Sequence, residues 1–114
     1  MPGTVLVSWG DTPFVPTLTV VGPTIYTPGQ TVTIQVTNGP GNLGDWVGLY
    51  ATTVGDVGFL SWTYLSGTTT LPETGLTTAT ITFTLPNTPG TYNCRLFQAG
   101  GYTKLATSLT LRVQ

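Results

Sequence analysis

The feature that most constrains this chain is an alternation of threonine with large apolar residues. It is clearest in the segment 31–37 (TVTIQVT) and returns in the segment 80–85 (TITFTL). Because successive side chains of a β-strand point to opposite faces, the pattern predicts strands with one face in a core and a threonine-covered face in water. Threonine, with 26 copies the commonest residue, suits that exposed face because β-branched side chains favour extended backbone.

Turn-forming residues separate the apolar runs. Gly and Pro cluster at 28–29, 38–42, 86–90 and 100–101, between stretches that are rich in Val, Ile, Leu and aromatic residues. Seven short strands at this spacing, without helical segments between them, predict an all-β fold, an antiparallel β-sandwich. We expect its strands at 17–22, 30–37, 45–51, 58–65, 78–85, 91–98 and 102–112, in a single domain over residues 17–114.

Two local patterns sharpen the fold prediction. Tyr92 stands two residues before Cys94 in the penultimate strand, and Trp46 follows Ile34 by 12 residues. The first pattern resembles the tyrosine corner of immunoglobulin-like (Ig-like) domains, and the second fits their buried tryptophan on the third strand. The resemblance implies that the Tyr92 hydroxyl bonds to nearby backbone. Because the second strand offers no cysteine, Cys94 is expected to be a buried thiol that packs as a small apolar group.

The segment 44–50 (GDWVGLY) also resembles a known family motif. It resembles the DW-[IV]-G-[LIVF]-[YF] strand of Ig-like modules in secreted bacterial proteins, and is similar to SKICH-type sandwiches and to the N-terminal domain of purple acid phosphatases. The resemblance covers roughly residues 17–113 and implies an Ig-like sandwich. Such modules accompany unrelated activities, so the motif indicates the fold far better than the function.

Charge is scarce and histidine is absent. The chain has three Lys and Arg residues, four Asp and Glu residues and a net charge of −1. Nucleophilic dyads that use histidine, and metal sites that use it, are therefore excluded, and three cations are too few to neutralise a nucleic-acid backbone. We expect no cofactor and no metal. Residues 12–44 carry no charge, but five prolines among them argue against a membrane span.

The few ionisable residues do not assemble into a predictable catalytic set. Asp45 is expected to cap a turn, Asp56 to lie in a turn beside Gly55, and Lys104 to be solvated. A calcium site from Asp45, Asp56 and the Asn42 carbonyl is the alternative. With no nucleophile, base and orienting group in sight, the sequence predicts a protein that is not an enzyme.

Aromatic residues exceed what one small core needs. Trp62 and Tyr64 lie two residues apart and so share one face of a strand, and Tyr102 stands beside a glycine pair. Flat aromatic faces with few charges around them suit stacking on sugar rings. We therefore predict a glycan platform of Trp62, Tyr64 and Tyr102, with core packing as the alternative for each residue.

The segment 71–75 (LPETG) matches the sortase sorting signal. A working signal stands before an apolar span and a basic tail, whereas strand-forming sequence follows here. We expect an inter-strand loop.

Residues 1–16 form an expected N-terminal arm. Val5, Val7 and Trp9 alternate, and Pro13 and Pro16 then interrupt the chain. The arm is either an extra strand of the same domain or an assembly contact that pairs with the sheet edge of another subunit.

Taken together, these patterns predict a non-enzymatic structural or adhesive protein, extracellular or on a virion surface. The first hypothesis is a subunit of a large assembly, such as a phage capsid decoration or fibre protein, whose partners are other subunits or copies of itself. The alternative is a carbohydrate-binding module of a secreted bacterial enzyme, with surface glycans as its ligand. The N-terminus lacks the basic region and cleavage site of a signal peptide, so we expect either earlier removal or another export route.

Overall fold

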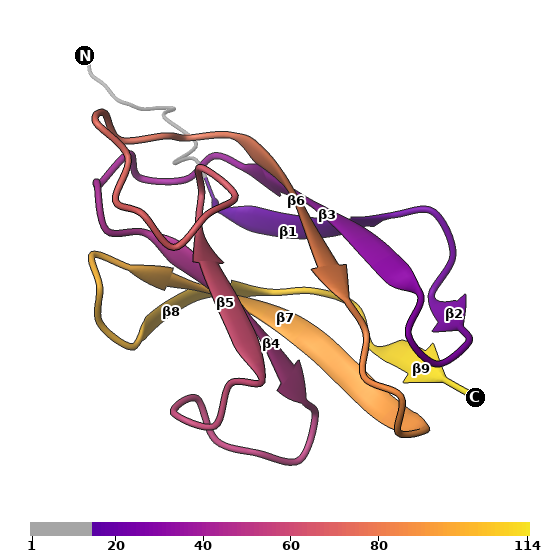
Figure 1. The fold of residues 1–114 in the computed structure, drawn as a ribbon. Helices are drawn as coiled ribbons and strands as arrows, with labels where there is room; N and C mark the ends of the chain where they lie inside the picture. The colour runs from indigo at the N-terminus through magenta and orange to yellow at the C-terminus, as the bar shows by residue number, and fades with distance from the viewer. Residues whose placement is uncertain (1–14) are drawn as a thin grey trace.

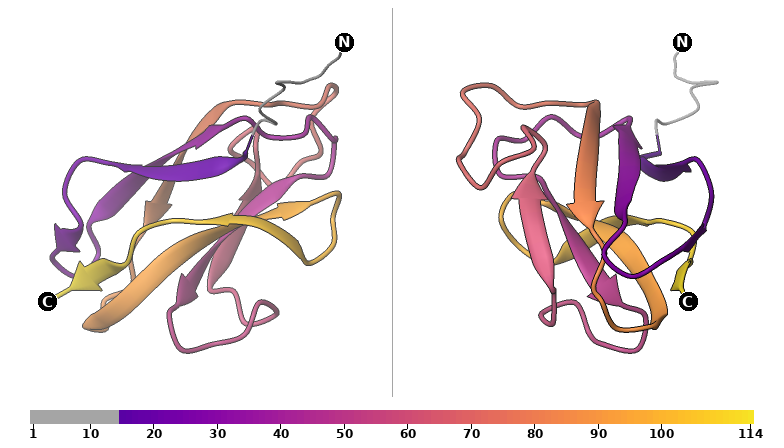
Figure 2. Two further views of the ribbon diagram at one scale, coloured as in Figure 1. Left: turned by 180° about the vertical axis from the view of Figure 1, so that it is seen from behind. Right: turned by 45° about the vertical axis from the view of Figure 1, so that its right-hand side comes forward.

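The computed structural model describes residues 15–114, whose regular structure is entirely β-strand (Figure 1). Two sheets face each other, as the rotated views show most clearly (Figure 2). The strands are β1 (Thr17–Val21), β2 (Ile25–Tyr26), β3 (Thr31–Thr37), β4 (Trp46–Ala51), β5 (Ser61–Tyr64), β6 (Ala79–Thr84), β7 (Gly90–Gln98), β8 (Thr103–Thr107) and β9 (Leu111–Val113).

The smaller sheet, sheet A, has the order β1-β3-β6, and the larger one, sheet B, has the order β2-β9-β7-β4-β5 with β8 also paired to β7. The predicted all-β class is thus confirmed. Three details differ from the prediction. The expected last strand breaks at residues 108–110 into β8 and β9, and the two-residue β2 was not predicted. Moreover, β2 pairs with β9 in parallel, so the sandwich is not wholly antiparallel.

Aliphatic side chains from both sheets fill the space between them. Sheet A contributes every second residue of β3 and β6, as the alternation predicts, and Ile34 is completely buried. Sheet B contributes Leu49 and Leu96, among others. No helix in the described part of the chain is long and apolar enough to cross a membrane.

Two predicted structural residues lie in this core. The Tyr92 hydroxyl donates a hydrogen bond of 2.6 Å to the Thr88 carbonyl, which is the local backbone contact that the tyrosine-corner resemblance implies. Cys94 is fully buried as a free thiol, and burial raises its pKa to about 12. The thiolate that would react with an oxidant or electrophile is therefore scarce at neutral pH.

Trp46 corrects the expectation of a tryptophan in the main core. Its side chain is buried, with 6% exposed, but it packs on the outer face of sheet B in a second cluster with Tyr50 and Phe97. Val47 and Leu49, its alternate neighbours on β4, fill the main core instead. The reason is the period of two: Trp46 and Leu49 have opposite parity on one strand, so only one of them can face sheet A.

Candidate functional site

The outer face of sheet B carries an aromatic pocket. Its volume is about 270 Å³, it is partly open to solvent, and we define it by the residues that line it: Trp46, Phe59, Trp62, Tyr64, Gly100 and Tyr102. This volume is near the lower end of ordinary small-ligand pockets, about 300–1,000 Å³.

Trp46 is the floor of the aromatic pocket. Its ring stacks on Phe97 with centroids 4.6 Å apart and an interplanar angle of 26°. Three other rings stand nearly perpendicular to it. The angles to Trp46 are 75° for Phe59, 78° for Trp62 and 85° for Tyr102, with centroids 5.6–6.1 Å away. Edge-to-face pairs of this kind fix ring orientation, so the walls of the pocket are held in place before any ligand arrives.

Strand register explains why these rings meet. Trp46 lies opposite Tyr64 on β5 and Phe97 on β7, so one row of side chains crosses the sheet. The next position along β4 on this face is Gly48, opposite Trp62. A Cβ there would lie 2.7 Å from Tyr50 Cε1 and 3.1 Å from Trp46 Cζ3. Glycine at this position therefore provides the room in which the neighbouring rings lie against the sheet.

The turn between β7 and β8 places Tyr102 in the lining of the aromatic pocket. Ala99 has a φ of +53°, which is uncommon for a residue with a side chain. Asp45 supports this turn, because its fully buried carboxylate accepts hydrogen bonds from the backbone N–H of Ala99 at 2.9 Å and of Asn42 at 3.0 Å. The Trp46 indole donates to the Gly101 carbonyl at 3.0 Å. The predicted capping role of Asp45 is confirmed, and it helps to build the site.

A β-bulge determines what stands next to the pocket. The register of β7 against β8 shifts between Leu96 and Phe97, so that Lys104 rather than Leu105 lies opposite Phe97. Bulges re-aim side chains in this way near functional sites. The shift places the Lys104 side chain on the outer face of sheet B.

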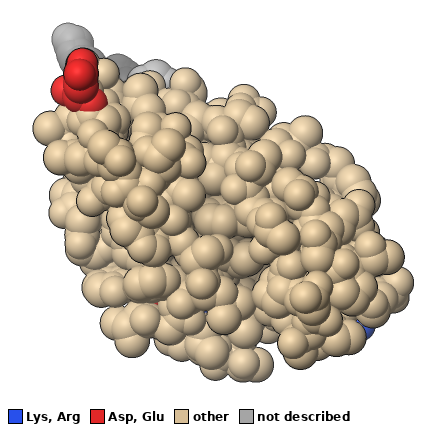
Figure 3. Space-filling view, in the orientation of Figure 1, with Lys and Arg blue, Asp and Glu red and all other residues tan. Residues whose placement is uncertain are grey.

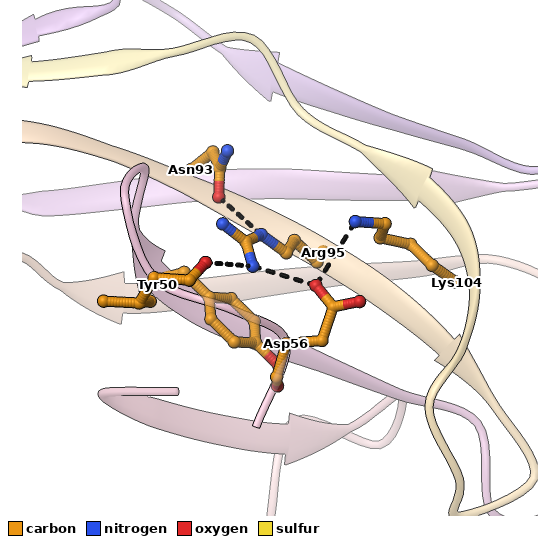
Figure 4. Close-up of polar contacts among 6 residues, drawn as sticks. Tyr50, Asp56, Asn93, Arg95 and Lys104 are labelled. Carbon is orange, nitrogen blue, oxygen red and sulfur yellow. Dashed lines mark hydrogen bonds and ion pairs between the residues drawn. The ribbon is translucent and has the colours of Figure 1, made fainter. Parts of the chain in front are cut away.

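Asp56 links the connection between β4 and β5 to that face (Figure 4). Its Oδ1 accepts from Arg95 Nη1 at 2.9 Å and from Lys104 Nζ at 3.2 Å, and its backbone carbonyl accepts from the Tyr50 hydroxyl at 2.6 Å. Burial, together with the negative charge of Asp56, raises the pKa of Tyr50 to about 12. The prediction that Asp56 lies in a turn is confirmed, but its ion pairs were not predicted.

The structure brings the three predicted platform residues together. Trp62 and Tyr64 lie 4.9 Å apart, centroid to centroid, with perpendicular rings, and Tyr102 completes the opposite side. Three further residues line the pocket that the sequence does not predict there. Phe59 precedes β5 although the sequence predicts it within a strand, and Gly100 is predicted only to lie in a turn. Trp46, predicted to be the buried tryptophan of the third strand, faces outward by its parity on β4.

The remaining predictions have mixed outcomes. Val5, Val7 and Trp9 lie outside the described residues, as does most of the expected arm. The 71–75 motif lies in the loop between β5 and β6, as predicted, and Gly75 packs against the Gly41 backbone so closely that a Cβ would lie 1.7 Å from its carbonyl oxygen. Within residues 15–114, no three Asp, Glu or Cys side chains are grouped as metal ligands.

Much of the surface is uncharged. In the orientation of Figure 3, almost all visible atoms belong to neutral residues, and one acidic group stands at one end of the molecule. The aromatic pocket has no charged lining residue. A ligand for it must therefore be recognised mainly by ring contacts and neutral hydrogen bonds.

Comparisons with known proteins give little guidance on function. No family model and no curated protein matches the sequence. Among solved structures, the chain is similar to a superoxide reductase (neelaredoxin) from Ignicoccus hospitalis, with a TM-score of 0.49 and 17% identity over 89% of this chain and 82% of that one. At this distance neither its activity nor its residues are transferred to this chain.

The comparison nevertheless corrects two predictions. We expected a protein that is not an enzyme, and specifically a structural subunit of an assembly, whereas the similar solved structure is that of an enzyme. Both predictions are contradicted by this finding and are withdrawn.

Proposed function

We propose that the aromatic pocket on the outer face of sheet B binds a saccharide, with one sugar ring inside it. The observation that carries this proposal is the meeting of five aromatic side chains, from β4, β5 and two connecting segments, around a partly open space of about 270 Å³. Sugar rings present apolar C–H faces that pack on aromatic rings, and the pocket supplies such rings on a floor and several walls.

The chemistry of the lining supports a neutral ligand that carries hydroxyl groups. Tyr64 and Tyr102 bring phenol groups and Trp62 an indole N–H, all of which form hydrogen bonds with hydroxyls. Tyr102 and Phe59 are 47% and 38% exposed, whereas Trp46 is 6% exposed. Solvent exposure therefore increases from the floor of the pocket to its rim. That gradient suits an amphipathic ring better than a purely apolar molecule.

A second ligand class is favoured by one specific observation. Three rings stand at 75–85° to the Trp46 plane, so the pocket is enclosed by aromatic surfaces on several sides. Such an enclosure also attracts quaternary ammonium groups through cation–π contacts. The nearby cations Arg95 and Lys104 oppose this class, and for that reason we place it second.

The test is a glycan array probed with the full chain, followed by calorimetric titration of each oligosaccharide that is retained. We expect Trp62→Ala to abolish binding and Trp62→Phe to restore part of it, because a ring remains for stacking. Leu109→Ala is the matched control, since Leu109 is 69% exposed and does not line the pocket. It should bind as the wild type does.

Two results would overturn the proposal. The first is a wild-type protein that retains no glycan on the array and shows no heat with oligosaccharides at millimolar concentration. The second is a Trp62→Ala variant that binds as tightly as the wild type while its circular dichroism is unchanged. Binding of tetramethylammonium chloride in place of any sugar would move the assignment to the second ligand class.

A further inference from the structure

One wall of the aromatic pocket comes from the long connection between β4 and β5. Phe59 belongs to the connection 52–60 between β4 and β5, yet its ring meets Trp46 at 5.8 Å and lines the pocket. We propose that Asp56 is a positioning residue for this pocket, whose carboxylate, held by Arg95 and Lys104, fixes the 52–60 connection so that Phe59 closes the wall. The inference rests on the proposed function for the ligand it serves.

Few contacts hold the middle of this connection. Val54 and Val57, which flank the carboxylate, are exposed apolar residues, and a Cβ built on Gly55 meets no atom within 4 Å. At the start of the connection the Thr52 hydroxyl bonds to that of Thr91 on β7. Further along, side chains of sheet B reach it through Arg95 to the Val54 carbonyl and the Asp56 carboxylate, Lys104 to that carboxylate, and Tyr50 to the Asp56 carbonyl. Three of these five bonds end on Asp56, which is therefore the main side-chain anchor in the middle of the connection.

The receptor for the carboxylate is built into the sheet. The Arg95 side chain is 6% exposed, its Nε donates to Asn93 Oδ1 at 3.1 Å, and its guanidinium lies 4.2 Å above the Tyr50 ring centroid (Figure 4). Asn93 and the Tyr50 ring, both on strands of sheet B, thus orient the guanidinium that receives the carboxylate. Its only acidic partner among residues 15–114 is Asp56.

The same carboxylate ties two sides of the pocket together. Arg95 stands on β7 and Lys104 on β8, two residues after Tyr102, which is another lining residue of the pocket. A buried cation without its counter-charge is strongly unfavourable. An aspartate at position 56 therefore holds the Phe59 wall in place through its charge, which a neutral residue of equal size lacks.

The experiment compares Asp56→Asn with the wild type by two measurements. The first is the nuclear Overhauser contact between the Phe59 ring and the Trp46 indole in the free protein, which we expect to weaken or vanish. The second is the affinity for a saccharide identified on the array, which we expect to fall about tenfold because the wall is no longer preorganised. Glu73→Gln is the matched control, an exposed carboxylate changed to an amide outside the pocket, and should alter neither measurement.

Each outcome decides the inference. An unchanged Phe59–Trp46 contact in folded Asp56→Asn overturns it. If Asp56→Asn does not fold, the double variant Arg95→Met/Asp56→Asn takes its place, since it removes the carboxylate without leaving a buried cation unpaired; a weakened contact supports the inference and an unchanged one overturns it. If the wild type binds no saccharide, the proposed function fails, and the contact between the two rings still decides whether Asp56 positions the wall.

Discussion

The outward faces of the two sheets differ although both sheets cover the same core. The outer face of sheet A is lined with threonine, as on β6, where Thr80, Thr82 and Thr84 are exposed and Ile81 and Phe83 are buried. The outer face of sheet B carries an aromatic cluster beside the Arg95–Asp56–Lys104 ion pairs, and five consecutive residues of β4 are buried. The outer face of sheet A is therefore solvated, whereas much of the outer face of sheet B is covered by side chains, and this cover is incomplete and leaves the aromatic pocket.

The largest expected effect separates the inner face of sheet B, at Leu49 on β4, from its outer face, at Trp62 on β5. Leu49, 1% exposed in the main core, should lose about 2–5 kcal/mol of unfolding free energy on replacement by alanine, because a cavity remains. Trp62→Ala on the outer face should cost less, since Trp62 is only half-buried. Urea unfolding of both variants measures this, and equal losses would show that the outer cluster is as much a core as the inner one.

Gly48→Ala probes the outer face with a single methyl group. The new Cβ would meet Tyr50 and Trp46 at 2.7 and 3.1 Å, and Tyr50 is held in place by its bond to the Asp56 carbonyl. We expect a loss of about 1–3 kcal/mol, as for other overpacked sites. Gly55→Ala is the control, because nothing lies within 4 Å of its Cβ. Similar stability of the two variants by urea unfolding would contradict the tight packing described here.

Alkaline titration compares a group from each face of sheet B. Burial raises the pKa of Cys94, on the inner face, from 9.0 to about 12, and that of Tyr50, on the outer face, from 10.0 to about 12. Because the folded values exceed the unfolded ones, the stabilisation is complete below pH 9 and is lost as pH rises toward 12.

The measurement is the free energy of unfolding between pH 8 and 11 for the wild type and for Cys94→Ala. The wild type should lose stability as soon as pH passes about 9, and Cys94→Ala should begin to lose it about one pH unit later, where unfolded Tyr50 ionises. Identical pH profiles would mean that the thiol is not shielded as the structure indicates.

The smallest expected effect contrasts a threonine from each sheet. Thr63 on β5 has a buried hydroxyl without a hydrogen-bond partner in the described part of the chain, so Thr63→Val should stabilise the protein by about 1 kcal/mol. Thr82 on β6 is exposed, and Thr82→Val should change stability by less than about 0.5 kcal/mol. Thermal unfolding checks both, and a destabilised Thr63→Val variant would refute the first expectation.

The fold was predictable where it depends on single strands that have one buried face and one solvated face. The alternation at 31–37 and 80–85 predicted β3 and β6 nearly to their ends. It could not show that the last strand breaks at Ser108, whose hydroxyl accepts from the Cys94 N–H at 2.9 Å across the sheet. It also could not show the parallel pairing of β2, because two residues carry no periodicity.

The candidate site was predictable in part for the same reason. Trp62 and Tyr64 are two residues apart, so any strand that contains both places them side by side on one face. Their contact with the same pocket as Phe59 depends on how the 52–60 connection folds back, and that depends on Arg95, 35 to 43 residues further along the chain. One available signal was overlooked: the run at 46–50 does not alternate, and a strand without alternation is covered on both faces.

The parallel pairing of β2 with β9 has a mechanical consequence. The Arg112 N–H donates to the Thr24 carbonyl at 2.8 Å, and the Gln114 N–H donates to the Tyr26 carbonyl at 3.0 Å. When a stretching force is applied between residues 24 and 114, two strands that run the same way are drawn in opposite directions along their length. Both bonds then bear the load together, in shear, whereas the bonds of a hairpin pulled from its open end break one after another. The two-residue strand β2 therefore resists extension of the chain more strongly than its length would suggest.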